Sequence, residues 1–435
     1  MSSSRRPQSK HQPQRPRKEK AVDVLAARSL ELPEGELPRV VVKTPSSNPL
    51  FYRKRIAHVD SSAGIGDLVK VEFEPRQHLG YGLYNPRAEI SLRMLSWEDV
   101  PPDRRYWEAR LLDACRLREE FLGLPQVADA YRLIHAEGDN LPGLVVDRYG
   151  DVLSAEVFSL AMYQRIDEIL SILEGHCGTK GRIVRTGPQV HGQEGFLAEP
   201  TTSPGLPEQV VIQEYGTRFK VKFAGGHKTG FFCDQRENRR ELARHCEGKS
   251  VLDLCTYTGG FAVQAKKLGN AGEVTGVELD EQPLGLAREN AALNQVRVNF
   301  VQADIFAYMR DMVQNGRQYD VVLLDPPKLI RSRMEIEQGT RTHFDMNRLA
   351  LQLVKPGGLF VSCTCAGLLG WEEFLKMIHA AARQAGPQRE RIEGEYQKPY
   401  RQLQLMGRSG AGGDHPIATH CPETEYLKLA WMRVV

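Results

Sequence analysis

The chain has 435 residues, of which 41% are hydrophobic and 26% are charged, and its formal net charge is +3. This length predicts two or three domains of an ordinary globular protein. No apolar run reaches the roughly 18 residues of a membrane span, and the polar, basic N-terminus is not a secretory signal. The eight cysteines form no CxxC pair and no disulfide framework, so we expect a cytoplasmic protein without a metal site.

The N-terminal residues carry most of the basic character. Residues 1–20 hold seven Lys or Arg and one acid, so their net charge is 7 − 1 = +6. The composition of residues 1–37 predicts a disordered basic tail. Such a tail suits a phosphate backbone, although a solubilising role without a specific partner fits the sequence equally well.

Short strands follow the tail. Residues 39–42 are β-branched, residues 68–73 alternate in the manner of a strand, and "LGYGLYNP" and "AEISLRML" continue the pattern. This spacing predicts a small β barrel over residues 38–100. Residues 105–122 have apolar side chains at helical spacing. Further strand and helix patterns then predict a linker helix and a middle α+β domain over residues 101–215.

From residue 216 to residue 435, strand and helix patterns alternate. The strands are "SVLDL", "EVTGVEL", "VNFVQAD", "YDVVLLDPP" and "LFVSCTC", with helical segments between them. Strict alternation predicts an α/β domain with a parallel, doubly wound sheet and helices on both faces.

Sheets of this kind bind ligands at the carboxyl ends of their strands. After the first strand, Asp253 precedes Gly259 and Gly260, which allow a sharp turn into a helix. The pattern is not GxGxxG, which disfavours a dinucleotide and favours a cofactor with a carboxylate. Glu278 ends the second strand, where an acid can bind ribose hydroxyls, and Asp304 ends the third, where it suits an adenine amine.

The fourth strand ends in "LDPPK", where two prolines keep the backbone extended and present Asp325 to a flat substrate. Each of these features alone fits a turn or a helix cap as well. Four of them in the right order predict an S-adenosylmethionine site of the class I methyltransferase type.

Several long motifs carry a family resemblance. They are "AEGDNLPGLVVDRYGD", "GHKTGFFCDQRENR", "VLDLCTYTGGF", "LDPPK", "CTCAGLL" and "GGDHPIATHCPETEYLK". Over residues 38–435 the chain resembles the RlmI-type, S-adenosylmethionine-dependent methyltransferases of large-subunit (23S) rRNA that act on cytosine C5. The resemblance implies an N-terminal PUA-like domain that binds RNA, a middle α+β domain and a C-terminal Rossmann-like methyltransferase domain.

The resemblance also implies site residues. The "GxKTGFFxDQR" segment of the family lies against the cofactor, although this chain has His227 where Gln is expected. An alternative for Asp234 is a helix cap. The implied cofactor-side residues are Lys228, Thr229, Gly230, Phe231, Asp234, Gln235, Arg236, Asp253, Thr256, Tyr257, Gly259, Glu278, Asp304 and Asp325.

Cytosine C5 becomes nucleophilic when a thiolate adds to C6, so the implied chemistry needs a cysteine. By motif match, Cys365 is the catalytic nucleophile, and Asp325 contacts the flipped cytosine as a second catalytic residue. Cys363 would share the face of Cys365, as a support, a competing nucleophile or a core residue. Asp414–Pro416 would shape the substrate mouth or form a surface loop.

The implied partner is ribosomal RNA, with Arg53, Lys54 and Arg55 as a basic cluster in the PUA-like domain, and no membrane is involved. Whether the chain forms a homodimer stays open. One alternative is a guanine or exocyclic-amine RNA methyltransferase in which Cys365 is structural. Another is a non-catalytic RNA-binding factor of ribosome assembly.

Overall fold

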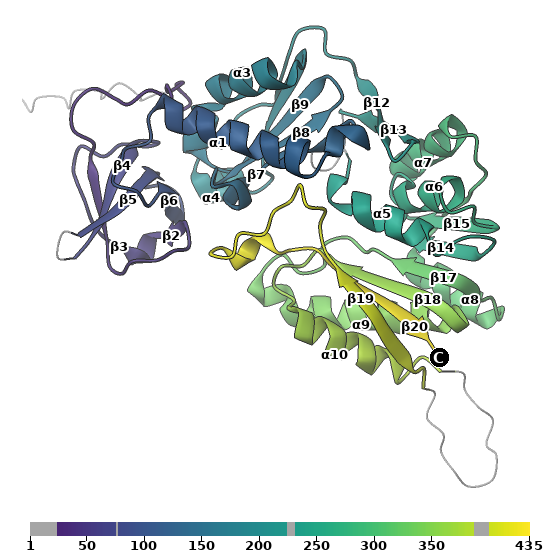
Figure 1. The fold of residues 1–435 in the computed structure, drawn as a ribbon. Helices are drawn as coiled ribbons and strands as arrows, with labels where there is room; N and C mark the ends of the chain where they lie inside the picture. The colour runs from purple at the N-terminus through teal and green to yellow at the C-terminus, as the bar shows by residue number, and fades with distance from the viewer. Residues whose placement is uncertain (1–23, 75–76, 224–230, 387–399) are drawn as a thin grey trace, which may run out of the picture.

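The computed structural model describes residues 24–74, 77–223, 231–386 and 400–435, and its strands form four sheets (Figure 1). The N-terminal sheet has six strands in the order β2-β6-β5-β4-β1-β3. Two of them, β2 and β3, were not predicted from the sequence; unlike β1, they have no run of β-branched residues. The strands are β1 Arg39–Val42, β2 Leu50–Tyr52, β3 Ile56–Val59, β4 Leu68–Phe73, β5 Gln77–Tyr84 and β6 Ile90–Ser96.

The expectation of a disordered tail over residues 1–37 is wrong for residues 24–37; residues 1–23 lie outside the described part. Leu30 is only 1% exposed and belongs to the core of the middle domain. Arg28 pairs with Asp67 at 2.7 Å, and the Leu30 N–H donates to Glu168. The segment is ordered because its apolar side chain finds a buried partner surface.

The middle domain has a five-stranded sheet in the order β11-β10-β9-β8-β7, packed against two helices. The first helix is N-capped by Asp103, whose carboxylate accepts the Tyr106 N–H at 3.0 Å, and it buries Trp107 against the sheet. The elements are α1 Arg104–Arg116, β7 Ala130–His135, β8 Leu144–Tyr149, β9 Val152–Val157, α2 Leu160–Tyr163, α3 Ile166–Cys177, β10 Gly181–Thr186, α4 Val190–Glu194 and β11 Thr201–Thr202.

A two-stranded hairpin connects the middle domain to the last one. It consists of β12 Gln209–Glu214 and β13 Thr217–Lys222. The proposed boundary between residues 215 and 216 falls in the turn of this hairpin. The boundaries of the three domains stay a prediction.

The last sheet has seven strands in the order β16-β15-β14-β17-β18-β20-β19. The first five are parallel, as predicted, whereas β20 is antiparallel to β18 and to β19. The strands are β14 Ser250–Leu254, β15 Glu273–Glu278, β16 Asn299–Gln302, β17 Tyr319–Leu324, β18 Val354–Thr364, β19 Leu403–Ser409 and β20 Lys428–Val434.

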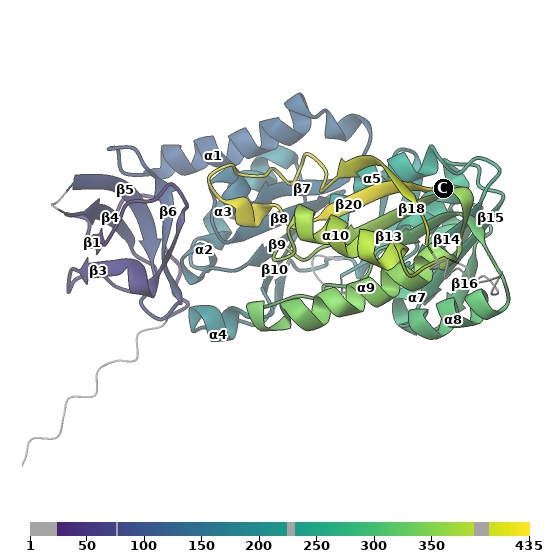
Figure 2. The same ribbon diagram turned by 90° about the horizontal axis from the view of Figure 1, so that it is seen from below.

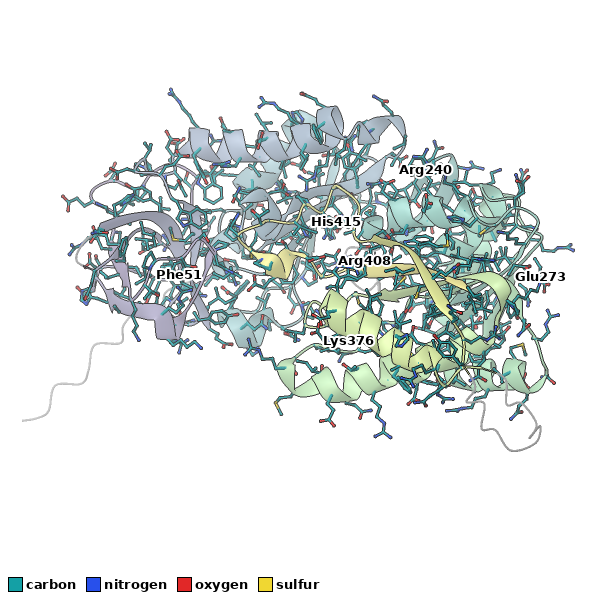
Figure 3. The ribbon with its side chains drawn as sticks, turned by 60° about the horizontal axis from the view of Figure 1, so that its bottom comes forward. Phe51, Arg240, Glu273, Lys376, Arg408 and His415 are labelled. Atoms are coloured by element: carbon teal, nitrogen blue, oxygen red, sulfur yellow. The ribbon has the colours of Figure 1, made fainter. Side chains whose placement is uncertain are left out.

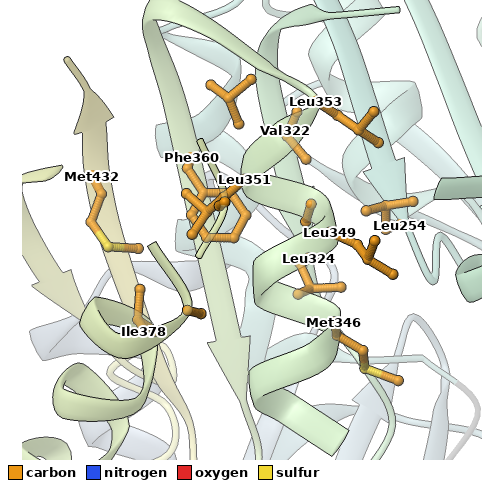
Figure 4. Close-up of a cluster of buried hydrophobic side chains, with 14 of the residues drawn as sticks. Leu254, Val322, Leu324, Met346, Leu349, Leu351, Leu353, Phe360, Ile378 and Met432 are labelled. Carbon is orange, nitrogen blue, oxygen red and sulfur yellow. The ribbon is translucent and has the colours of Figure 1, made fainter. Parts of the chain in front are cut away.

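Helices cover both faces of this sheet because its strands are apolar on both sides. On β17, Val322 and Leu324 face one core cluster, and Val321 and Leu323 face the other. The first cluster includes Phe360 and side chains of α8, α9 and α10 (Figure 4), and the second includes side chains of α5 and α6. The helices are α5 Arg236–Ala243, α6 Gly260–Lys267, α7 Glu281–Leu293, α8 Ile305–Gln314, α9 Ile336–Gln352 and α10 Trp371–Ala382.

The segment between β19 and β20 connects the three domains (Figures 1 and 2). Asn48 of the N-terminal domain donates to Glu423 at 3.2 Å, and the rings of Trp97 and His420 lie 5.8 Å apart. His415, on the same segment, lies in the middle of the molecule between the N-terminal sheet and the seven-stranded sheet (Figure 3). Within the described ranges, no helix has the length and apolar character needed to cross a membrane.

Candidate active site

The four predicted acids converge at the carboxyl edge of the seven-stranded sheet. Cys255, one residue past β14, lies among them. Burial raises its thiol pKa well above the usual value, and the charges of four carboxylates raise it further. These are the carboxylates of Glu278, Asp325, Asp253 and Asp304. Neighbouring parallel strands thus bring side chains more than 70 residues apart in the chain into one acidic cluster.

Asp253 is the most deeply buried of these acids. One oxygen, Oδ2, accepts from Thr256 Oγ1 at 2.5 Å and from the Ala262 N–H at 3.1 Å. The other, Oδ1, has no hydrogen-bond partner among the described residues. Burial raises the pKa of this carboxyl to about 7, and the two hydrogen bonds only partly offset the effect.

The loop after β14 is held in an unusual backbone conformation. Tyr257 has a φ of 52°, and its N–H donates to Glu278 Oε2 at 2.9 Å. Gly259 has a φ of 79°, and a Cβ atom there would lie 3.1 Å from both Ala287 and Phe300. Non-glycine residues with positive φ are uncommon and often occur at ligand sites. The loop therefore needs glycine at residue 259 to bring β14 and α6 together.

Glu278 and Asp304 have additional local roles. Glu278 Oε1 accepts from the Leu279 N–H at 2.9 Å, and Asp304 caps α8 by accepting the Ala307 N–H at 3.0 Å. The cap that the sequence left open for a strand-end acid is thus present at Asp304. Its second oxygen stays available, because a carboxylate accepts several hydrogen bonds.

Asp325 is oriented by a chain of hydrogen bonds. Its Oδ2 accepts from Gln235 Nε2 at 3.0 Å, and Gln235 Oε1 accepts from Asn238 Nδ2 at 2.7 Å. Asn238 Oδ1 then accepts from Ser409 Oγ at 2.8 Å, and Ser409 Oγ accepts from Trp431 Nε1 at 2.7 Å. The chain links the loop after β17 to α5, β19 and β20, so it restricts the direction in which the Asp325 carboxylate points.

The neighbours of Gln235 bind other parts of the molecule. Asp234 Oδ2 accepts from Tyr426 Oη at 2.6 Å, and burial together with that carboxylate raises the Tyr426 pKa well above its usual value. Arg236 is fully buried and donates to both carboxylate oxygens of Asp414, at 3.1 and 3.0 Å. The cap alternative for Asp234 is wrong, because no side chain caps α5 and the N-cap residue is Gln235.

The two cysteines at the end of β18 lie in different surroundings. Cys363 is completely buried, and its pKa is raised far above the usual value by burial, by the charge of Asp325 and by a hydrogen bond to Asp325. Cys365 follows the last residue of β18, is half-buried, and packs against the same core cluster. The Cys363 sulfur thus lies beside Asp325, and of the two sulfurs only that of Cys365 is partly accessible.

The remaining predicted residues divide into two groups. Phe231 is 6% exposed and packs on Phe219, with ring centres 5.2 Å apart, in a core cluster that includes the β12–β13 hairpin. Lys228, Thr229 and Gly230 lie outside the described residues. The cofactor role of every predicted site residue stays a proposal.

Sequence reasoning missed the residues that hold the site together. Tyr426 bonds to Asp234 from 192 residues away, and Ser409 bonds from 171 residues away to Asn238, which in turn bonds to Gln235. Their side-chain types carry no local signal for such contacts. In the part of the chain that the structure describes, no cluster of three or more His, Cys, Asp or Glu could hold a metal ion.

The acidic cluster fits a cationic methyl donor with a ribose. S-Adenosylmethionine has a sulfonium, an ammonium and ribose hydroxyls, all of which favour carboxylate acceptors. The unpartnered Asp253 Oδ1, the remaining acceptor capacity of Glu278 and the tight Gly259 turn supply these features. The residues present therefore fit the group.

A family model described as S-adenosylmethionine-dependent methyltransferase matches residues 198–399, and a model of a PUA-like domain matches residues 31–97. A solved structure of a methyltransferase from Streptococcus mutans has the same fold, with a TM-score of 0.73 and 20% identity over 91% of this chain and 100% of that one. The fold and the site thus define a class I S-adenosylmethionine-dependent methyltransferase with a PUA-like domain, and S-adenosylmethionine is the cofactor.

Curated relatives are similar over nearly the whole length. The chain is 34% identical to ribosomal RNA large subunit methyltransferase I of Tolumonas auensis, over 89% of this chain and 96% of the relative. It is 33% identical to the protein of the same name from Vibrio cholerae, over 88% and 94%. The chain belongs to the ribosomal RNA large subunit methyltransferase I family.

The pKa of Asp253 predicts a pH dependence of stability. Because the folded pKa is about 7 and the ordinary value is 3.8, the folded state holds this proton more tightly. The free energy of unfolding of the cofactor-free protein should therefore fall as the pH rises from about 4 to 7, by as much as about 4 kcal/mol. Urea unfolding at several pH values should show a shallower decline for Asp253→Asn; equal slopes would contradict the assignment.

The hydrogen-bond chain predicts the effect of Asn238→Asp. This change removes the donor to Gln235 and leaves a carboxylate facing its carbonyl oxygen, so Asp325 loses its fixed orientation. We expect kcat to fall about tenfold or more, the KM for S-adenosylmethionine to stay within about twofold, and stability to drop by about 1–3 kcal/mol. Steady-state kinetics checks this, with Asn299→Asp on the exposed strand β16 as control. An unchanged kcat would show that the chain does not orient Asp325.

Proposed function

We propose that the protein transfers a methyl group from S-adenosylmethionine to C5 of a cytosine in large-subunit ribosomal RNA, through a covalent adduct between Cys365 and C6. The observation that carries the proposal is the position of Cys365, which immediately follows β18, is half-buried and lies two residues after Cys363, the thiol that is hydrogen-bonded to Asp325. The names of the curated relatives support ribosomal RNA as the substrate.

S-Adenosylmethionine, when bound, supplies an electrophilic methyl group. Cys365 acts as the nucleophile: its thiolate bonds to C6, and the electrons of the C5–C6 double bond make C5 reactive. After C5 is methylated, water takes the C5 proton, the electrons of that C–H bond form the C5–C6 double bond again, and the bond between C6 and the sulfur breaks, which restores the ring and the thiolate. Asp325 orients the cytosine by a hydrogen bond to its N3 or N4 edge.

Cys363 is a poor alternative nucleophile. Complete burial and the hydrogen bond to Asp325 keep its thiol protonated, and a thiol adds to C6 far more slowly than a thiolate. Cys363 instead helps to orient Asp325 through this hydrogen bond. The half-buried Cys365 is the sulfur that a flipped base can reach.

One experiment identifies the product. The protein and labelled S-adenosylmethionine are incubated with total RNA from a strain that lacks the enzyme, and the labelled nucleoside is identified by mass. We expect 5-methylcytidine in the large-subunit rRNA. Label in guanosine or on an exocyclic amine would contradict the C5 chemistry, and RNA without label would favour a non-catalytic RNA-binding role.

A further inference from the structure

A basic loop follows β17 next to the candidate active site. This loop, residues 328–334, begins three residues after Asp325. Lys328, Arg331 and Arg333 are all exposed. Within the described ranges, none of their cationic groups forms an ion pair. Exposed cations beside an RNA-modifying site that form no such pair are available for phosphates.

The backbone of the loop is fixed, although its cations are exposed. Ile330 is fully buried in the core cluster shared by α9 and β17. The Arg331 N–H donates to Glu335 Oε2 at 2.6 Å. A Cβ atom on Gly339 of α9 would lie 2.6 Å from the Leu329 carbonyl oxygen, so helix and loop are in close contact. The loop therefore presents its side chains from a preorganised frame, which lowers the entropy cost of binding.

The helix α9, which contacts the loop, also contacts the end of β18. His343 of α9 contacts Thr364 Oγ1 through Nε2 at 3.2 Å, and Asn347 Oδ1 accepts from Ser362 Oγ at 2.6 Å. Cys365 is the residue after Thr364. Figures 1 and 2 both place the N-terminal end of α9 at the end of the methyltransferase domain nearest the N-terminal sheet. The loop thus lies between the candidate nucleophile and the domain that resembles an RNA-binding module.

Met334 is the last residue of the loop and is 94% exposed, the highest value among the large hydrophobic side chains of the described residues. Single exposed apolar side chains are common on protein surfaces. This one is preceded by Arg333 and lies on the loop that begins three residues after Asp325, at a site that must receive an unstacked base. Proteins that distort nucleic acids often insert an apolar side chain between bases.

We propose that the loop 328–334 docks the RNA substrate: its three cations bind phosphates flanking the target cytosine, and Met334 fills the gap that the flipped base leaves. This inference rests on the proposed RNA substrate and names how that substrate is held. The charge of the three cations fits a polyanion. Met334 favours RNA over an acidic peptide, because an extruded base leaves a space for an apolar side chain.

Binding tests the cations without any methyl transfer. The affinity for in vitro transcribed large-subunit rRNA is measured at several salt concentrations for the wild type and for the double variant Arg331→Ala/Arg333→Ala. The matched control is Lys267→Ala/Arg297→Ala, two exposed cations near the amino edge of the sheet. We expect the first variant to bind on the order of tenfold more weakly, with a salt slope smaller by about 1.5, and the control to match the wild type. Equal behaviour of the two double variants would overturn the proposal.

Met334 is tested by kcat. Met334→Ser should lower kcat about tenfold with little change in rRNA affinity, whereas Met334→Leu should retain most of the rate because an apolar side chain of similar volume still fills the gap. Equal kcat values for Ser and Leu would remove Met334 from the proposal. If the wild type itself neither binds nor methylates rRNA, the proposed function fails; if it does both and the variants are unaffected, only this inference fails.

Discussion

Cys365→Ala is expected to lose at least about 10⁴-fold in kcat while it still binds S-adenosylmethionine. The reason is that the other two thiols at the site, Cys255 and Cys363, have pKa values raised well above the usual value by burial and therefore stay protonated, and removal of a covalent nucleophile typically has an effect of this size or larger. Methylation of rRNA by labelled cofactor gives the rate, and calorimetry gives the cofactor affinity. A rate within about tenfold of the wild type would make Cys365 structural and favour methylation of a guanine or an amine.

Cys363→Ala is the matched control for this prediction. The two sulfurs are two residues apart, but Cys363 is completely buried and bonded to Asp325. Its removal should lower the rate by no more than about tenfold, since it takes away one hydrogen bond and leaves the nucleophile in place. The opposite ranking of the two variants would reassign the nucleophile to Cys363.

Asp414→Asn should destabilise the protein by about 3–5 kcal/mol, because the change leaves the buried Arg236 guanidinium with only the partly exposed Glu237 as its counter-charge. Asp414 is fully buried and bonds three parts of the molecule. Its carboxylate pairs with Arg236 of α5 and accepts the Arg132 N–H of β7 at 3.0 Å, while its backbone carbonyl accepts from Arg118 at 2.6 Å. Chemical unfolding of both proteins at neutral pH measures the difference.

The pH dependence and a control sharpen this test. Burial raises the Asp414 pKa, but the positive charges of His415 and Arg236 overcome the effect and hold it far below the usual value. A depressed pKa contributes stability above the unfolded value of about 4, and this contribution is lost as the pH falls below it. The gap between wild type and variant should therefore narrow below about pH 4. Asp151→Asn, which breaks an exposed pair with Lys180, should change stability by at most about 1 kcal/mol; an equal loss in both variants would contradict the buried role.

Much of the fold could be predicted from the sequence because the strand and helix periods are strong. Residues 39–42 and 68–73 form strands with the predicted bounds, and the apolar spacing of "IFAYMRDMVQ" matches α8. The helix α10 and the antiparallel strands β19 and β20 were not predicted. Sequence periodicity gives the face of a strand but not the direction of its partner, and the strict alternation of strand and helix ends before β19.

The convergence of the strand-end acids was predictable for a topological reason: parallel strands bring their carboxyl ends to one edge. The partners of the "DQR" segment were not. The contact between Arg236 and Asp414 joins residues 178 apart, and the sequence left Asp414 open as part of a surface loop, whereas it is fully buried. A charged side chain is predicted to be exposed unless the oppositely charged residue that pairs with it is known.

The most direct test uses a mechanism-based trap. Large-subunit rRNA transcribed with 5-fluorocytidine has no C5 proton to lose, so a thiolate that has added to C6 cannot leave after methylation. With S-adenosylmethionine and this RNA, the wild type should form a complex that survives denaturation, and peptide mass mapping should place the modified nucleotide on Cys365. A denaturation-sensitive complex, or a nucleotide attached to any other residue, would contradict the covalent mechanism at Cys365.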